Sequence, residues 1–391
     1  MVYVGIDVAK DKHDCCIMSS EAVFPVQSFT INNNSEGFEL LLSRIKSVAH
    51  DLDKTKVGLE ATGHYSYNIL GFLLDKGLHT YVINPLHTNL FRKSLSLRKT
   101  KTDKVDARTI AAMMMSGVGL DSYSDTLYHN EELKSLTRYR FNLVRRRAEL
   151  KQSLSRLVVI LFPELEHLVS SLHLNAVYAL LAVAPSAKHI AQMHLSRLTN
   201  LLHTESNGRF AREKAIEIRD AARKSIGCSM NAKSLELCHT IHQITALSEQ
   251  IEEVEAEIKR ILDETNPPIL SIPGIGLQMG AMILAEIGDC SRFSSSDKLL
   301  AFAGMSPSTY QSGQLTSSHA RMEKRGSCYL RYALYNATKY VCHWDPTFSA
   351  YLAKKRAEGK HYNVALSHAA KKLVRVIFAL QRSGEVYKVA A

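Results

Sequence analysis

Four carboxylates on short motifs are the residues of this chain with the clearest capacity for chemistry. Asp7 lies in an apolar run at the start of the chain, and Glu60 ends a second such run. Asp103 and Asp106 open an apolar helical pattern, and residues three apart share one helix face. Mg²⁺ prefers oxygen ligands, and two such ions can stabilise both oxygens that exchange in a phosphate-ester displacement. The set therefore predicts a Mg²⁺ site that acts on phosphate esters.

Each of these residues taken alone also has an ordinary structural explanation. Asp103 can cap a helix, Asp106 is then a first-turn acid, and the other two can face solvent. However, Asp7 stands inside an apolar strand pattern, and a buried charge costs on the order of several kcal/mol unless a partner or metal neutralises it. As a set in this order, the four carboxylates favour the metal site.

The elements that must position these carboxylates form an α/β pattern. β-Branched and aromatic runs predict strands near 2–8, 13–18, 23–31, 55–60 and 79–83. Ser35 is expected to cap a helix that runs to about His50, and Gly77 is expected to close a helix over 65–76. Gly5 inside the first strand predicts a close backbone approach. This order agrees with a ribonuclease-H-like mixed sheet.

Basic residues gather beside the third acidic motif and along the helix expected after it. Contacts from such side chains to phosphate groups position a nucleic acid without reading its sequence. An amphipathic helix from Asn130 to about Phe162 carries many basic and few aromatic residues, which favours a nucleic-acid-facing role over a membrane one. The alternative for the basic residues beside the third acidic motif is a solvated face. The candidate nucleic-acid-binding residues of these two segments are Arg98, Lys99, Lys101, Lys104, Arg145, Arg146 and Arg147.

A second long helix is expected over 237–262, with apolar residues repeating at threes and fours up to Asn266-Pro267-Pro268. This pattern predicts a coiled coil and self-association as a dimer or tetramer. The alternative, equally open, is a helix that packs within its own chain against 130–162.

A glycine-rich turn follows these prolines and precedes another apolar helix. Pro273-Gly-Ile-Gly276 resembles the turn of a helix–hairpin–helix DNA-binding element. Gly274 and Gly276 would let backbone N–H groups meet a phosphate at the start of the next helix. Gly-rich turns between helices are common, so this motif indicates DNA binding only together with the motifs that follow it.

The motifs G-I-D-V-A-K, G-L-E-A-T-G and K-T-D-K-V-D-A-R occur in that order, and the C-terminal third adds 299–307, Y-Q-S-G and 324–331. In these residues the chain resembles the DEDD transposases of bacterial insertion sequences, which include the pilin-gene invertases. The resemblance leaves out roughly 160–235. It implies a ribonuclease-H-like (Holliday-junction-resolvase-like) metal-binding domain over 1–125, a helical coiled-coil region over 126–266, and a mainly helical C-terminal transposase domain over 267–391.

The resemblance implies a DNA transposase or recombinase in which a serine acts together with the Mg²⁺ site. It assigns the nucleophile to Ser312, although Ser317, Ser318 and Ser327 are close enough to stay alternatives. Lys324 and Arg325 would contact nucleic acid. The implied partners are donor and target DNA and an RNA encoded by the element. Two other functions stay open: a metal-dependent nuclease or junction resolvase without a covalent intermediate, and a basic architectural binder.

Composition limits the remaining classes of function. The 391 residues carry a formal net charge of +11, which favours a polyanionic partner. The 7 cysteines form no C-x-x-C pair, so neither a zinc site nor a disulfide framework is expected. No apolar run reaches the roughly 18 residues of a membrane span, and the first residues lack a signal-peptide pattern. We expect a bacterial cytoplasmic, nucleoid-associated protein.

Overall fold

The computed structural model describes residues 1–21, 26–49, 51–60, 63–83, 85–95, 103–117, 125–307, 311–312, 315–316 and 322–389. Within these ranges the side chains of 27, 63, 86, 95, 103–104, 125–130, 311–312 and 315–316 lie outside the description. The chain divides into two compact units, residues 1–132 with 288–294 and residues 133–287 with 295–391.

The first unit is built on a five-stranded mixed sheet with strand order β3-β2-β1-β4-β5. The neighbours β1 and β2 are antiparallel, as are β2 and β3, whereas β4 is parallel to both β1 and β5. All five strands agree with the ranges expected from the β-branched and aromatic runs. Their bounds are β1 Val2–Val8, β2 Lys12–Ser19, β3 Val26–Asn32, β4 Thr55–Glu60 and β5 His79–Ile83.

Helices cover both faces of this sheet. Val4, Ile6 and Val8 of β1 pack with α1 (Ser35–Val48) and α2 (Tyr67–Asp75), while the alternate residue Tyr3 packs with α4 (Asp103–Met115). The helix α3 (Pro85–Leu95) precedes α4. The expected cap of α1 is wrong by one residue: Asn34 is the N-cap, and its side chain accepts a hydrogen bond from the Gly37 amide. Asparagine is a strong N-cap because its side-chain oxygen satisfies an otherwise unpaired amide.

Two glycines let α4 lie directly on the sheet. A Cβ atom at Gly5 would come within 2.1 Å of the Ala107 carbonyl oxygen, and one at Gly58 within 2.8 Å of Met114. Gly5 and Gly58 are register partners on β1 and β4, so the two gaps lie side by side. The close backbone approach predicted at Gly5 is thereby confirmed, and the approaching element is α4.

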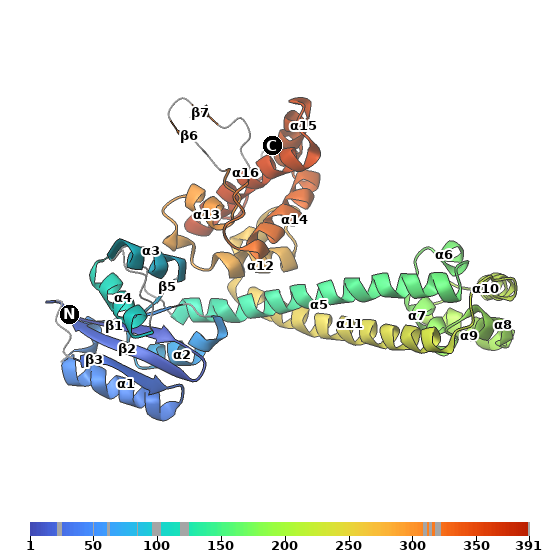
Figure 1. Cartoon of the computed structure of the whole chain (residues 1–391). Coiled ribbons are helices and arrows are strands. Elements are labelled where there is room, and N and C mark those ends of the chain that lie inside the picture. The colour runs from blue at the N-terminus through green and yellow to red at the C-terminus, as the bar shows by residue number, and fades with distance from the viewer. Residues whose placement is uncertain are drawn as a thin grey trace. The chain divides into compact units, whose positions relative to one another are not determined.

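The second unit contains a long antiparallel pair of helices, α5 (Asp125–Leu161) and α11 (Asn231–Thr265), which run side by side in Figure 1. Arg140 pairs with Glu255, and Arg147 donates to Ser248 at 3.1 Å, so contacts step in opposite directions along the two helices. Five short helices pack onto one end of the pair around Phe162, Leu180 and Leu237. They are α6 Leu165–Leu168, α7 Asn175–Val183, α8 Ala187–Gln192, α9 Leu195–Glu205 and α10 Arg212–Arg223.

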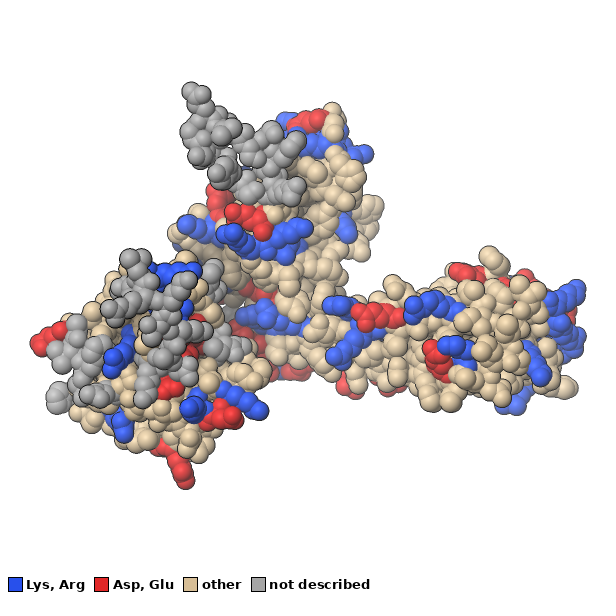
Figure 2. Space-filling view, in the orientation of Figure 1, with Lys and Arg blue, Asp and Glu red and all other residues tan. Residues whose placement is uncertain are grey.

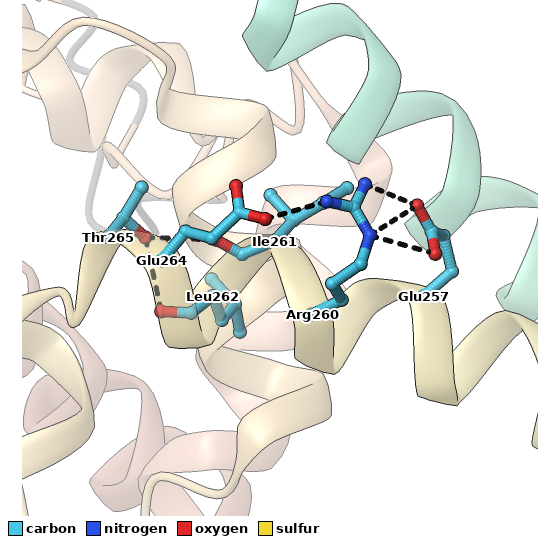
Figure 3. Close-up of polar contacts among 6 residues, drawn as sticks. All are labelled: Glu257, Arg260, Ile261, Leu262, Glu264 and Thr265. Atoms are coloured by element: carbon cyan, nitrogen blue, oxygen red, sulfur yellow. Dashed lines mark hydrogen bonds and ion pairs between the residues drawn. The ribbon is translucent and has the colours of Figure 1, made fainter.

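The apolar positions expected to mediate self-association over 237–262 are covered by the chain itself. Ile244 and Ile251 are only 1% and 3% exposed, and Ile244 belongs to the core shared with α5. The outward face of α11 is charged: Arg260 bridges Glu257 and Glu264 one turn to either side (Figure 3). This is the in-chain packing that the heptad-like pattern left open.

The C-terminal helices complete the second unit. Their bounds are α12 Leu277–Ile287, α13 Ser296–Phe302, α14 Cys328–Trp344, α15 Pro346–Ala357 and α16 Tyr362–Ser383, with the two-residue strands β6 Gln311–Ser312 and β7 Leu315–Thr316 between α13 and α14. Ala281 and Ala285 of α12 pack with Leu133 of α5 and with Ile258 and Leu262 of α11. Among the described residues no helix is long and apolar enough to span a membrane.

Candidate acidic site and nucleic-acid-binding surfaces

Two of the four predicted carboxylates lie on the same face and at the same end of the sheet. Asp7 follows Gly5 by two residues in β1, and Glu60 follows Gly58 by two in β4. Alternate residues of a strand share a face, and the two glycines are register partners. Asp7 and Glu60 are therefore neighbours on the face covered by α4, at the C-terminal ends of two parallel strands.

The helix α4 runs antiparallel to these strands. Tyr3, near the start of β1, packs with Met113 and Met114 near the end of the helix, whereas Gly5 meets Ala107 one to two turns earlier. The N-terminal end of α4 is thus directed toward the strand ends that carry the two carboxylates. Asp103 is the first residue of α4, and its side chain lies outside the described residues.

Asp106 lies in the first turn of α4 and is only 7% exposed. Arg92 of α3 donates to its Oδ1 atom at 2.9 Å and also donates to Asn89. A buried carboxylate needs such a partner, since an unpaired one would be strongly destabilising. Asp106 is therefore paired with Arg92 beside the strand ends, and a metal ion there would share this carboxylate with Arg92.

A further carboxylate, Asp14, was missed by sequence reasoning. It is directly opposite Asp7 in the β1–β2 register, so the two side chains share a face. Asp14 is 6% exposed and accepts a hydrogen bond of 2.7 Å from Thr30 on β3. No local signal singles it out, because only the hairpin register brings it to Asp7.

The donor chemistry of this sheet edge fits a hard divalent cation. Its carboxylates offer only oxygen ligands, which Mg²⁺ prefers. Like charges directly opposite on two strands destabilise a sheet, and a cation beside Asp7 and Asp14 would offset that repulsion. Within the described part of the chain, which excludes the Asp103 side chain, no three His, Cys, Asp or Glu residues form a ready metal-binding group.

The segment of the predicted serine is described only in part. Ser312 ends β6, which pairs with β7, but its side chain lies outside the description, as do Gly313, Ser317 and Ser318. Ser327, an alternative nucleophile by sequence, is already engaged: its hydroxyl caps α14 and donates to Glu286 at 2.5 Å. That engagement marks Ser327 as structural.

The loop before α14 is fixed by its backbone. Gly326 lies at φ 128°, where a Cβ atom would come within 2.1 Å of the Phe302 carbonyl oxygen. Arg331 donates to the Ala303 carbonyl at 3.2 Å. Lys324 and Arg325 are exposed on this anchored loop.

The other candidate nucleic-acid-binding residues differ in their exposure and in their partners. Arg98, Lys99 and Lys101 lie outside the described residues, as does the side chain of Lys104. Arg146 is exposed on α5, Arg145 pairs with Glu149, and Arg147 is turned toward α11. On the face drawn in Figure 2, basic side chains are spread over the long helical pair and the C-terminal helices, with acidic ones beside them.

Gly274 and Gly276 precede α12 and differ in their surroundings. Gly274 lies at φ 92°, and a Cβ atom there would come within 2.5 Å of the Tyr340 backbone on α14. A Cβ atom at Gly276 would meet nothing within 4 Å. Gly274 therefore lets the turn pack on α14. Gly276 leaves the backbone of the turn accessible to a ligand such as a phosphate group.

Comparison with known proteins matches both ends of the chain. A family model described as "Transposase" covers residues 4–163, and one described as "Transposase IS116/IS110/IS902 family" covers residues 266–353. A 44.8 kDa protein of insertion element IS116 from Streptomyces clavuligerus is 25% identical over 100% of this chain and 96% of its own length. The pilin gene-inverting protein of Moraxella bovis is 24% identical over 98% of this chain and 97% of its own length.

These matches make the chain a DNA transposase or recombinase. It belongs to the IS116/IS110/IS902 family of insertion-sequence transposases, as the resemblance in its motifs predicted.

Proposed function

We propose that this transposase cleaves and exchanges DNA strands at a Mg²⁺-dependent acidic site, through a covalent serine–DNA intermediate. The observation that supports it most is the convergence of Asp7, Glu60 and Asp106 on one end and one face of the sheet, with Asp14 opposite Asp7. The strand order and directions support a ribonuclease-H-like fold for this unit.

Asp7, Glu60, Asp103 and Asp106 would hold the Mg²⁺ ions. When bound, the metal supplies positive charge that polarises a phosphate ester and lowers the pKa of an attacking hydroxyl. Arg92 orients Asp106, and the glycine-lined contact between α4 and β1 fixes the helix that carries two of the four carboxylates.

Ser312 is the nucleophile in this proposal. Its Oγ atom attacks a backbone phosphorus, a new Oγ–P bond forms, and one bond from phosphorus to a deoxyribose oxygen breaks. The serine hydroxyl loses its proton, and the departing oxygen gains one and leaves as a hydroxyl group. Attack by a hydroxyl of another DNA strand reverses these events and joins the strands. A serine hydroxyl needs such activation because it is a weak nucleophile by itself.

The nucleic-acid partners in this proposal are donor DNA, target DNA and a guide RNA encoded by the element. The exposed Arg146, Lys324 and Arg325 would contact phosphates, which position a nucleic acid without reading its sequence. Because two duplexes must be held during exchange, the active form would be a homo-oligomer, a dimer or tetramer, that associates with the nucleoid. The division of the chain into three domains, with boundaries after residues 125 and 266, is also part of this proposal.

A strand-joining assay tests the proposed reaction. Purified protein, copurified RNA, donor and target DNA and Mg²⁺ should give recombinant junctions detectable by amplification across the joint. Cut ends without junctions would instead indicate a metal-dependent nuclease. The RNA that copurifies is sequenced in parallel; RNA mapping beside the gene supports the guide, and random cellular RNA contradicts it.

A further inference from the structure

An open groove in the second unit is lined by aromatic and polar side chains from three helices. It has a volume of about 720 Å³ and lies between the turn at Pro273–Gly276, the helix α14 and Arg140 of α5. The acidic site of the other unit contributes nothing to its lining.

One stripe of α14 supplies most of the large side chains. Tyr332, Asn336, Tyr340 and Trp344 follow one another at intervals of four residues, so they share one face of the helix. Tyr332, Tyr340 and Trp344 are 41%, 59% and 65% exposed. Ala333, Ala337 and Val341, each the next residue along the helix, are buried and fix the helix in this orientation. Large aromatic rings exposed together on a fixed element mark a binding surface.

The walls of the groove are fixed as well. Tyr332 packs edge-on against Phe141 of α5, with ring centroids 4.9 Å apart. The Pro-Gly turn lies against the α14 backbone at Tyr340, where Gly274 leaves no room for a side chain. Gly276 faces open space, and Gln278 and Arg140 add polar groups to the lining. The groove is thus formed before any ligand binds.

We infer that this groove binds unpaired nucleotides, whose bases stack on Tyr340 and Trp344. Base stacking on aromatic side chains tolerates any sequence, and the polar lining can contact base edges and the sugar–phosphate backbone. In a duplex the base faces are covered by neighbouring pairs, whereas a strand separated for exchange exposes them. The inference rests on the family's action on nucleic acid and is independent of the Mg²⁺ site and of Ser312.

The only tryptophan of the chain makes this inference directly measurable. Trp344 fluorescence is followed while the full-length protein, freed of copurified RNA, is titrated with single-stranded oligothymidine, with oligouridine or with a DNA duplex. EDTA is present throughout, so that no cleavage occurs. We expect saturable quenching by one or both single strands and little by the duplex. The comparison of the two single strands tells whether DNA or RNA is preferred.

Variants separate stacking from general attraction. Tyr340→Ala should weaken the binding of the single strand by about 5- to 100-fold, the usual loss for one stacking partner, while Tyr340→Phe retains it. Tyr362→Ala is the control, because Tyr362 is 42% exposed and does not line the groove. Unchanged affinity in Tyr340→Ala, or equal quenching by duplex and single strand, would overturn the inference. A change in Trp344 fluorescence that depends on protein concentration alone would indicate that a second copy of the chain occupies the groove. That result would also overturn the inference.

Discussion

At the scale of single residues, the strand register brings Asp14 directly opposite Asp7 at the candidate acidic site. Both lie on the face covered by α4, and Asp14 is almost fully buried. Thr30 donates one hydrogen bond to Asp14, which orients the carboxylate without adding charge. A cation bound beside both carboxylates would reduce the repulsion between them, so we expect metal affinity to depend on Asp14 although it is not one of the four predicted ligands.

Replacing Asp14 with Asn should weaken Mg²⁺ binding by about 10- to 100-fold, the usual effect of a residue that supports a metal ligand. The amide keeps the volume and the contact with Thr30 but removes the charge. Isothermal titration calorimetry with Mg²⁺ measures the change. The control is Asp11→Asn, since Asp11 is exposed just before β2. Equal affinity in the two variants would show that Asp14 has no part in the site.

Charge removal at the predicted ligands should have a larger effect on the reaction. We expect Asp7→Asn and Asp106→Asn to lower recombination by roughly two orders of magnitude or more, because a carboxylate ligand is lost. Circular dichroism should show both variants folded. Recombination at nearly wild-type rates in either variant would remove that residue from the site.

The residues of the acidic site were predictable from the sequence to the extent that local pattern carries them. Asp7 and Glu60 stand out because each follows a glycine in an apolar strand pattern. Asp14 does not, because its importance comes from the register of a hairpin. No local signal singles out Arg92, because its pairing with Asp106 depends on how α3 and α4 pack.

At the scale of elements, the contact between α4 and the sheet is the feature most sensitive to a small change. Gly5→Ala would bring a methyl group to 2.1 Å from the Ala107 carbonyl oxygen and 2.5 Å from the Ala111 amide. Backbone atoms cannot move aside as a flexible side chain can. We expect a loss of about 1–3 kcal/mol in the free energy of unfolding, typical of overpacking, and a loss of recombination.

The matched control for this change is Gly71→Ala. Gly71 lies in α2, where a Cβ atom meets nothing within 4 Å. Alanine in an open helical position should stabilise the protein by about 0.5–1 kcal/mol. Thermal unfolding compares the two variants. Equal melting temperatures would contradict the close packing of α4 on β1.

The long helix α11 gives a second test at this scale. Ile244→Glu places a carboxylate in the core between α11, α5 and the short helices, so we expect a loss of about 3 kcal/mol or more. Leu235→Glu should be nearly neutral, because Leu235 is 58% exposed on the same helix. Chemical denaturation measures both. A folded Ile244→Glu variant that loses only its oligomeric state would instead support the coiled coil between chains.

The sequence predicts the elements better than it predicts their partners. Proline and asparagine at 266–268 mark the end of α11, and β-branched runs mark all five strands of the sheet. The repeat over 237–262 has the same form whether the partner helix belongs to this chain or another. Only the buried contacts with α5 decide between these partners.

At the scale of the whole molecule, the chain separates the acidic sheet from the segment that carries Ser312. The first unit holds Asp7, Glu60 and Asp106, and the second holds β6 and the aromatic groove. The proposed reaction therefore uses groups from two units. Matched family models cover residues of both units.

The most direct test of this account is whether DNA becomes covalently joined to Ser312. Protein, copurified RNA, end-labelled DNA and Mg²⁺ are incubated and resolved on a denaturing gel. We predict a labelled protein band that requires Mg²⁺, disappears in Ser312→Ala, and persists in Ser317→Ala and Ser318→Ala. A labelled band that persists in Ser312→Ala, or joined DNA products formed by that variant, would contradict the account.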